Sequence, residues 1–205
     1  GSFKIASKTE KCPVFVGKVV NHVKVGPSPK WLANYLHAYG IKSINNVVDI
    51  SNFVMVETGQ PLHYYDLSKL PHHEITVVDD VEMTMQALDG QDYEIKKGDL
   101  LITTGGQPTG IAEIMGGEES KIDESTTSIF IEAAVFNAVS IRNTARRLGL
   151  STEAAMHFTK GIEPMAPIKA VDRSVQLLKE LAEAEGFEEN VMVGTIEDSM
   201  KTVTE

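Results

Sequence analysis

The stretch SIFIEAAVF, residues 128–136, carries a single carboxylate, Glu132, inside an otherwise apolar run. Its length and its β-branched and aromatic residues predict a buried strand. Because side chains alternate along a strand, Glu132 shares one face with Phe130 and the two flanking isoleucines take the other. A carboxylate that is buried without a partner costs several kcal/mol. Glu132 must therefore face water, accept a hydrogen bond from a partner in the protein, or accept one from a bound ligand.

Helices and short strands are mixed around this run without a regular β-α-β alternation, which favours the α+β class. Capping residues and apolar spacing predict helices over residues 28–40, 45–59, 137–149 and 165–186. Alternating or apolar runs predict strands over residues 14–25, 74–79, 82–88, 91–95, 99–103 and 191–196. In the first helix, Ser28 is expected as the N-cap and Pro29 as the first helical residue. Asp89-Gly90 predicts a hairpin turn.

The composition is that of a soluble globular protein of 205 residues, with 42% hydrophobic and 23% charged residues. No apolar run approaches the ~20 residues of a membrane-spanning helix, so no membrane partner is expected. Cys12 is the only cysteine, which excludes an intrachain disulfide and favours a cytoplasmic protein. The formal net charge of -10 argues against a protein that grips nucleic acid by itself.

Three parts are expected along the chain. Residues 1–13 are interpreted as an expression-tag scar, Gly1-Ser2, and a polar, irregular and flexible leader. Residues 14–196 form the main region, with a possible subdivision near residues 60–75, and residues 197–205 form a polar tail.

A histidine stands in unusual company in TGQPLHYYD, residues 58–66, because Gly59 and Pro61 both interrupt a helix. A lone histidine is more often structural than functional. A metal site at His63 with Asp66 lacks the spacing of known helical or zinc-finger sites. From the residues alone, His63 is therefore either a core residue or part of a reaction centre.

Two further stretches combine glycine with polar residues. IMGGEES, residues 114–120, is simplest as a hairpin turn, although its glycines also allow a ligand to approach the backbone closely. RRLGLSTEA, residues 146–154, joins a helix end to a turn, where Arg146 and Arg147 either complement the helix dipole or contact phosphate. Thr152 offers a hydroxyl and Ala154 a small wall.

Several long segments occur in one order: SINNVVDISNFVMVETGQPLHYYDL, IMGGEES, IEAAVFNAVSIRNTARRLGL and STEAA. Together they resemble the third and fourth modules, the editing region, of the beta chain of bacterial phenylalanyl-tRNA synthetase, from about Val14 to Glu185. The resemblance implies an α+β fold of two interlocked subdomains that hydrolyses tyrosine wrongly attached to tRNA(Phe). The implied partners are the tRNA(Phe) 3′ end carrying tyrosine and an alpha subunit in an alpha2-beta2 enzyme. No cofactor is implied in this region, since ATP and Mg serve the synthetic site of the complete enzyme.

On this resemblance, His63 is the editing histidine, with Pro61 in the same wall, and Glu132 is the glutamate that selects tyrosine. The substrate-binding residues are expected to be Glu132, Gly116, Thr152, Ala154, Pro61 and Lys42. Lys42 stands where the family has arginine and loses that residue's planar fork.

The sequence also departs from the family elsewhere. Tyr64-Tyr65 replace Ala-Phe, residues 157–161 replace Arg-Phe-Glu-Arg-Gly, and Glu113 replaces a glycine, which implies strain if its φ is positive. The departures at Lys42 and Glu113 motivate an alternative, a non-catalytic module that contacts tRNA or another subunit. A metal-dependent hydrolase is a more distant third reading.

Overall fold

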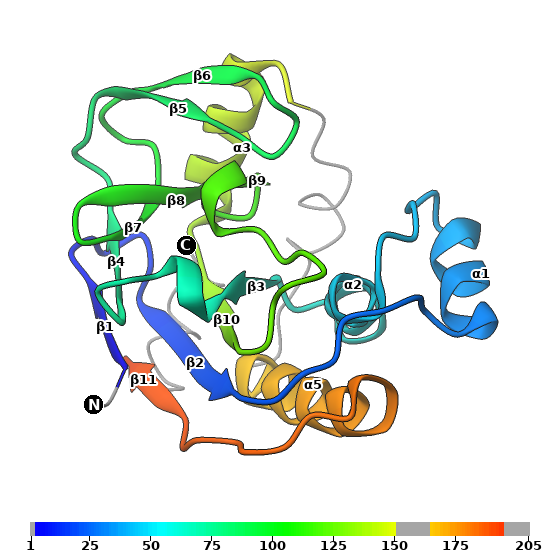
Figure 1. Cartoon of the computed structure of the whole chain (residues 1–205). Helices are drawn as coiled ribbons and strands as arrows, with labels where there is room; N and C mark the ends of the chain where they lie inside the picture. Colours follow the sequence, from blue (N-terminus) through cyan, green and yellow to red (C-terminus); the bar gives the residue numbers. More distant parts are fainter. Residues whose placement is uncertain (1–2, 151–164, 195–205) are drawn as a thin grey trace.

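A four-stranded antiparallel sheet forms the centre of the molecule (Figure 1). The computed structural model describes residues 3–150 and 165–194. The sheet order is β11 (Val191–Val193), β2 (Val14–Val20), β10 (Ile129–Val135) and β3 (Leu62–Asp66). All seven residues of β10 are buried, as its apolar sequence predicts. Strand β3 is an edge strand, and its outer edge has no neighbouring strand in the described parts of the chain.

The alternation along β10 divides the core into two layers. Ile129, Ile131 and the other odd-numbered residues pack with helices α2 (Asn46–Thr58) and α5 (Ala166–Ala182). Phe130 and Ala134 point to the opposite face, into a second cluster shared with the other sheet. The central sheet is therefore buried on both faces; in Figure 1 the second sheet lies above it, α5 below it and α2 to its right.

The second sheet has five strands in the order β1 (Lys4–Ser7), β4 (Glu74–Val78), β7 (Leu101–Thr104), β8 (Gln107–Ile111) and β9 (Met115–Gly116). Strand β1 runs parallel to β4, and the remaining pairs are antiparallel. A separate hairpin joins β5 (Met83–Gln86) to β6 (Asp92–Ile95) through the predicted Asp89-Gly90 turn, where Gly90 has φ +78°. Short 3-10 turns occupy Leu67–Lys69 and Glu118–Ser120. These elements confirm the α+β class.

Local capping signals predicted two helices well. The Asn45 side chain accepts a hydrogen bond from the Val48 N–H at the start of α2, and Gly59 ends that helix in the left-handed region. Helix α3 (Ala138–Leu148) has the same arrangement, with Asn137 as its N-cap and a left-handed Gly149 at its end.

Two helix boundaries differ from expectation. Helix α1 (Lys30–Ala38) has Pro29 as its N-cap, one residue later than predicted, because the Ser28 hydroxyl donates instead to Asp49, 2.5 Å away. Helix α5 ends at Ala182 and not near Gly186, because the chain after it turns to follow β2, where the Asn21 N–H donates to the Gly186 carbonyl.

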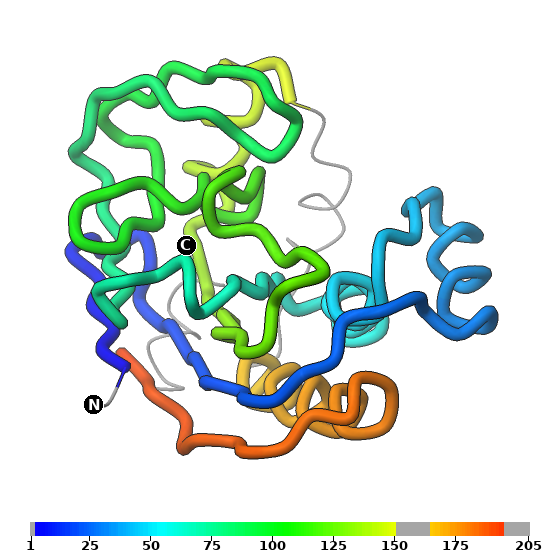
Figure 2. The backbone as a smooth tube through the Cα atoms, viewed as in Figure 1, coloured from blue at the N-terminus to red at the C-terminus, as the bar shows by residue number. Residues whose placement is uncertain are grey.

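The expectation of an irregular leader is wrong for part of residues 3–13. Residues Lys4–Ser7 form β1, and the Phe3 ring stacks on Phe130 with centroids 3.9 Å apart. Figure 2 shows this first strand beside β11 from the other end of the chain. The strand escaped prediction because its partner, β4, lies far along the sequence. The remaining domain boundaries stay predictions. Within the described residues, no helix is long and apolar enough to cross a membrane.

Candidate functional site

A pocket of about 1000 Å³ lies along the free edge of β3. Consecutive residues of β3 line it, including Leu62, His63 and Tyr64, so the pocket reaches both faces of the edge strand. Helix α2, residues 110–116 and residues 121–124 form the other walls, and Glu132 of β10 also contributes. The volume is at the upper end of the ~300–1000 Å³ range of small-molecule sites, which leaves room for more than one amino-acid side chain.

Strand pairing brings Glu132 and His63 together. The two residues are directly opposite in the antiparallel β10–β3 register, so both side chains lie on the face toward the second sheet. Glu132 is only 5% exposed. Burial raises the pKa of its carboxyl to about 7, against the opposing effect of a hydrogen bond from Tyr65.

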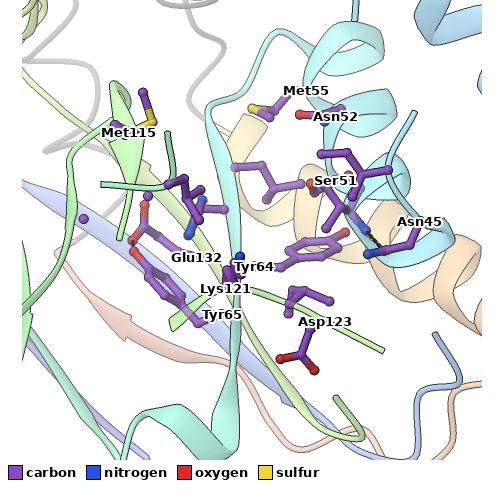
Figure 3. A pocket seen from close by; sticks show the side chains of 18 of the residues that line it. Asn45, Ser51, Asn52, Met55, Tyr64, Tyr65, Met115, Lys121, Asp123 and Glu132 are labelled. Atoms are coloured by element: carbon purple, nitrogen blue, oxygen red, sulfur yellow. Dashed lines mark hydrogen bonds between the residues drawn. The ribbon is translucent and has the colours of Figure 1, made fainter. Parts of the chain in front are cut away.

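That hydrogen bond shows how the buried carboxylate of Glu132 is satisfied within its apolar strand. The Tyr65 hydroxyl donates to Glu132 Oε1 over 2.6 Å, and Tyr65 itself is 1% exposed. Figure 3 shows Tyr65 turned toward Glu132, while the neighbouring Tyr64 points to the other side of β3. Glu132 is therefore a buried carboxylate that has met a partner within the protein.

His63 is held closely from two sides. The Tyr65 ring meets its imidazole edge-on with centroids 4.4 Å apart. A Cβ placed on Gly116 would lie 2.7 Å from His63 Cε1, so only glycine leaves room for the imidazole at this position. Burial lowers the His63 pKa to about 4, which leaves the imidazole neutral at pH 7.

Glu113 adds a second carboxyl group to the pocket wall. Its φ of +59° confirms the conformation that favours glycine and costs about 1–2 kcal/mol for an L-residue. Burial, followed by the charge of Glu132, raises the Glu113 pKa to about 8. Cys12 is also buried near both carboxyls, and burial raises its pKa, so the thiol stays protonated and is a poor nucleophile.

The structure brings together four of the predicted site residues. Pro61, His63, Gly116 and Glu132 all line the same pocket. Lys42 does not join them, because it is exposed on the loop between α1 and α2 and lines a separate depression.

The other residues singled out in the sequence are described only in part. Thr152 and Ala154 lie outside the described residues, as do residues 157–161. Arg147 contacts Asp99 and donates to the Glu94 carbonyl, which gives this arginine a structural partner within the protein.

Sequence reasoning missed Tyr65 as the partner of Glu132. The signal was present, because Tyr65 is two residues from His63 and therefore shares its face on a strand. What was lacking was the pairing of β3 with β10.

A cluster of metal ligands is not seen in the described parts of the chain. Within residues 3–150 and 165–194, no three His, Cys, Asp or Glu side chains are grouped to hold a metal ion.

Comparison with known proteins places the chain in a family. The family model described as the B3/4 domain matches residues 11–183. The phenylalanine–tRNA ligase beta subunit of Staphylococcus haemolyticus is 43% identical over 188 residues, which cover 91% of this chain and 24% of that protein. The corresponding subunit of Synechococcus sp. (strain JA-3-3Ab) is 44% identical over 179 residues, covering 83% and 22%.

An N-terminal fragment of the phenylalanyl-tRNA synthetase beta-subunit from Pyrococcus horikoshii also matches in structure. The match has a TM-score of 0.48 and 9% identity, and covers 85% of this chain and 49% of the fragment. The chain spans about a quarter of the length of the curated ligase subunits that it matches. On the match over residues 11–183, the chain belongs to the B3/4 domain family.

Proposed function

We propose that this chain is the editing module of a phenylalanine–tRNA ligase beta subunit, and that it hydrolyses tyrosine wrongly attached to tRNA(Phe). The observation that carries the proposal is the pair of buried Glu132 and half-buried His63, which lie opposite one another on neighbouring strands and line a pocket of about 1000 Å³. The relatives named as ligase beta subunits support it, as does the room that Gly116 leaves for the imidazole.

Glu132 supplies the selection between tyrosine and phenylalanine. The two amino acids differ by one hydroxyl, which a merely apolar pocket barely distinguishes. A buried carboxylate distinguishes them strongly, because the phenol donates a hydrogen bond that phenylalanine lacks. Sites built to bind a hydroxyl reject the analogue without it by ~10⁴-fold or more.

His63 positions the attacking water. Its neutral imidazole accepts a hydrogen bond from the water, whose oxygen bonds to the ester carbonyl carbon. The bond from that carbon to the ribose oxygen then breaks, and the proton lost by the water ends on the ribose oxygen. The products are free tyrosine and tRNA with an intact 3′ end. A pKa of about 4 makes His63 a weak base, so a neighbouring ribose hydroxyl shares in the proton transfer.

The other partners belong to the complete enzyme. The net charge of -10 indicates that most of the grip on tRNA comes from outside this chain. The alpha subunit of an alpha2-beta2 assembly and the ATP- and Mg-dependent synthetic site would likewise lie outside it. Such a protein works in the cytoplasm. Thr152, Ala154 and Lys42 are proposed as further contacts for the aminoacyl-tRNA end.

Deacylation of tyrosyl-tRNA(Phe) by the complete ligase tests the proposal. His63→Ala is expected to slow it by ~10²-fold or more, on the scale of a lost positioning or proton-transfer group. Glu132→Ala is expected to reduce the preference for tyrosyl- over phenylalanyl-tRNA(Phe). Unchanged rates in both variants would remove this pocket from the reaction.

A non-catalytic contact module is the second candidate, and the Tyr65–Glu132 hydrogen bond favours it, because the carboxylate already has a phenol partner. This reading predicts no tyrosine-dependent binding to the pocket. A tyrosine-specific chemical-shift change centred on His63 and Gly116 would exclude it.

A further inference from the structure

We propose that Tyr65 is a specificity-determining positioning residue, whose hydroxyl holds one oxygen of Glu132 so that the other is presented, charged and oriented, to the phenol of the ligand. The inference rests on the proposed function and names the residue that sets its selectivity. It stands on the geometry of three side chains on neighbouring strands.

Tyr65 is itself fixed from several directions. It is opposite Phe130 in the β10–β3 register, and their ring centroids lie 6.4 Å apart. On its other side the ring contacts the His63 imidazole edge-on. Because the ring is packed between these neighbours and is 1% exposed, its hydroxyl delivers a hydrogen bond in one direction, toward Glu132.

Glu132 depends on this donor. Among the residues that the structure describes, the Tyr65 hydroxyl is the one hydrogen-bond donor to the carboxylate, and it reaches Oε1. The side chain of Glu132 lines the pocket, and its second oxygen is the atom that we assign to the ligand hydroxyl. A donor on one oxygen fixes the plane of the carboxylate and favours its charged form.

The charge matters because hydrogen bonds to ionised groups are roughly twice as strong as those between neutral groups. In affinity, the difference corresponds to about tenfold. The preference for a hydroxyl-bearing ligand is therefore expected to rise as Glu132 ionises, near pH 7. Loss of the Tyr65 hydroxyl would move that rise to higher pH.

The described titratable groups around Glu132 are few. His63 lies opposite on β3, Tyr65 donates from the same strand, Glu113 lines the wall, and Cys12 lies before β2. His63 stays neutral above pH 6, and Cys12 and Tyr65 keep their protons, because burial raises the pKa of both. Glu113 titrates in the same range as Glu132, so it must be removed in a control.

The test measures binding and not catalysis. Adenosine carrying tyrosine or phenylalanine through a 3′-amide, which resists hydrolysis, is titrated into the 205-residue chain between pH 6 and pH 9. Both probes carry the same amino group, so its titration cancels in the ratio of their affinities. For the unsubstituted chain, the tyrosine-to-phenylalanine ratio is expected to rise through about pH 7.

Tyr65→Phe is expected to lower the ratio by about threefold at pH 7 and to shift the rise upward by about one pH unit. The same shift is expected when Glu113→Gln is also present. Glu132→Gln should give a low ratio at every pH. The matched control is Tyr93→Phe, which removes another tyrosine–carboxylate bond, to Asp89 on the β5–β6 hairpin, and should change nothing.

Three results would overturn the inference. An unchanged ratio and midpoint in Tyr65→Phe would show that Glu132 needs no help from Tyr65. A higher ratio would show that Tyr65 competes with the ligand for the carboxylate. Equal or undetectable binding of both probes by the unsubstituted chain would overturn the proposed function together with the inference, whereas the first two results leave that function standing.

Discussion

Gly116→Ala is a sharp probe of the pocket, because it adds one methyl group beside the imidazole. The new Cβ would lie 2.7 Å from His63 Cε1 and 2.8 Å from Leu88 Cδ1. Ordinary contacts begin at 3.4 Å, so the imidazole must move by about 0.7 Å. Gly116 is not among the glycines with positive φ, so alanine meets no backbone strain there.

The expected loss follows from that displacement. Misplacing a catalytic group by about 1 Å costs roughly 10²-fold in rate. Overpacking a core costs about 1–3 kcal/mol, and Leu88 absorbs part of it because its side chain is 38% exposed. We therefore expect Gly116→Ala to slow tyrosyl-tRNA(Phe) deacylation by the complete ligase between tenfold and a hundredfold, with a modest fall in the free energy of unfolding.

A second substitution separates the two contacts. Leu88→Ala added to Gly116→Ala removes the clash with the leucine and should recover stability, measured by urea unfolding. It leaves the contact with His63, so deacylation should stay slow. The reasoning would be refuted if Gly116→Ala kept its deacylation rate within threefold, or if the double variant recovered that rate.

Three further outcomes are expected. Burial raises the Glu132 pKa from an ordinary value of 4.5 to about 7. Its contribution to the free energy of unfolding is therefore present below pH 4.5 and is lost as the pH rises to about 7. Glu132→Gln should abolish that loss, which amounts to as much as about 3 kcal/mol, when urea unfolding is measured from pH 5 to pH 8. Cys12 should resist alkylation by iodoacetamide in the folded chain and react on unfolding, as followed by mass spectrometry. Phe3→Ala should lower stability by about 3 kcal/mol or more in thermal unfolding, and an effect near zero would contradict the packing of β1.

The predictable parts of the fold were those that local chemistry decides. Helices α2 and α3 each begin at an asparagine cap and end at a left-handed glycine, signals contained within a few residues. Strand β1 has no such signal, because Lys4–Ser7 gains its stability from pairing with β4, which begins at Glu74. A pairing over that separation cannot be read from four residues.

In the site, as in the fold, local features could be predicted from the sequence and the pairing of distant strands could not. The sequence alone showed that the carboxylate of Glu132 is unusual in an apolar strand. It also showed, by the alternation of side chains, that Glu132 shares a face of the strand with an aromatic residue. Phe130 does share that face, but it packs into the core between the sheets. The hydroxyl that satisfies Glu132 comes from Tyr65, and only the register of β3 against β10 brings them together.

The raised pKa values also bear on the proposed binding of an RNA end by an acidic chain. Two ionised carboxylates in one pocket would repel a phosphate backbone. Burial raises the pKa of Glu113 to about 8 and that of Glu132 to about 7, so these two carboxyls carry only part of their full charge at pH 7. That residual charge sits where a phenol hydroxyl can use it, beside a neutral imidazole. Raising the pH to 9 would ionise both carboxyls, so it should weaken binding of a probe bearing a 5′-phosphate more than binding of plain adenosine, whereas an equal effect would show that the pocket's charge does not reach the nucleotide.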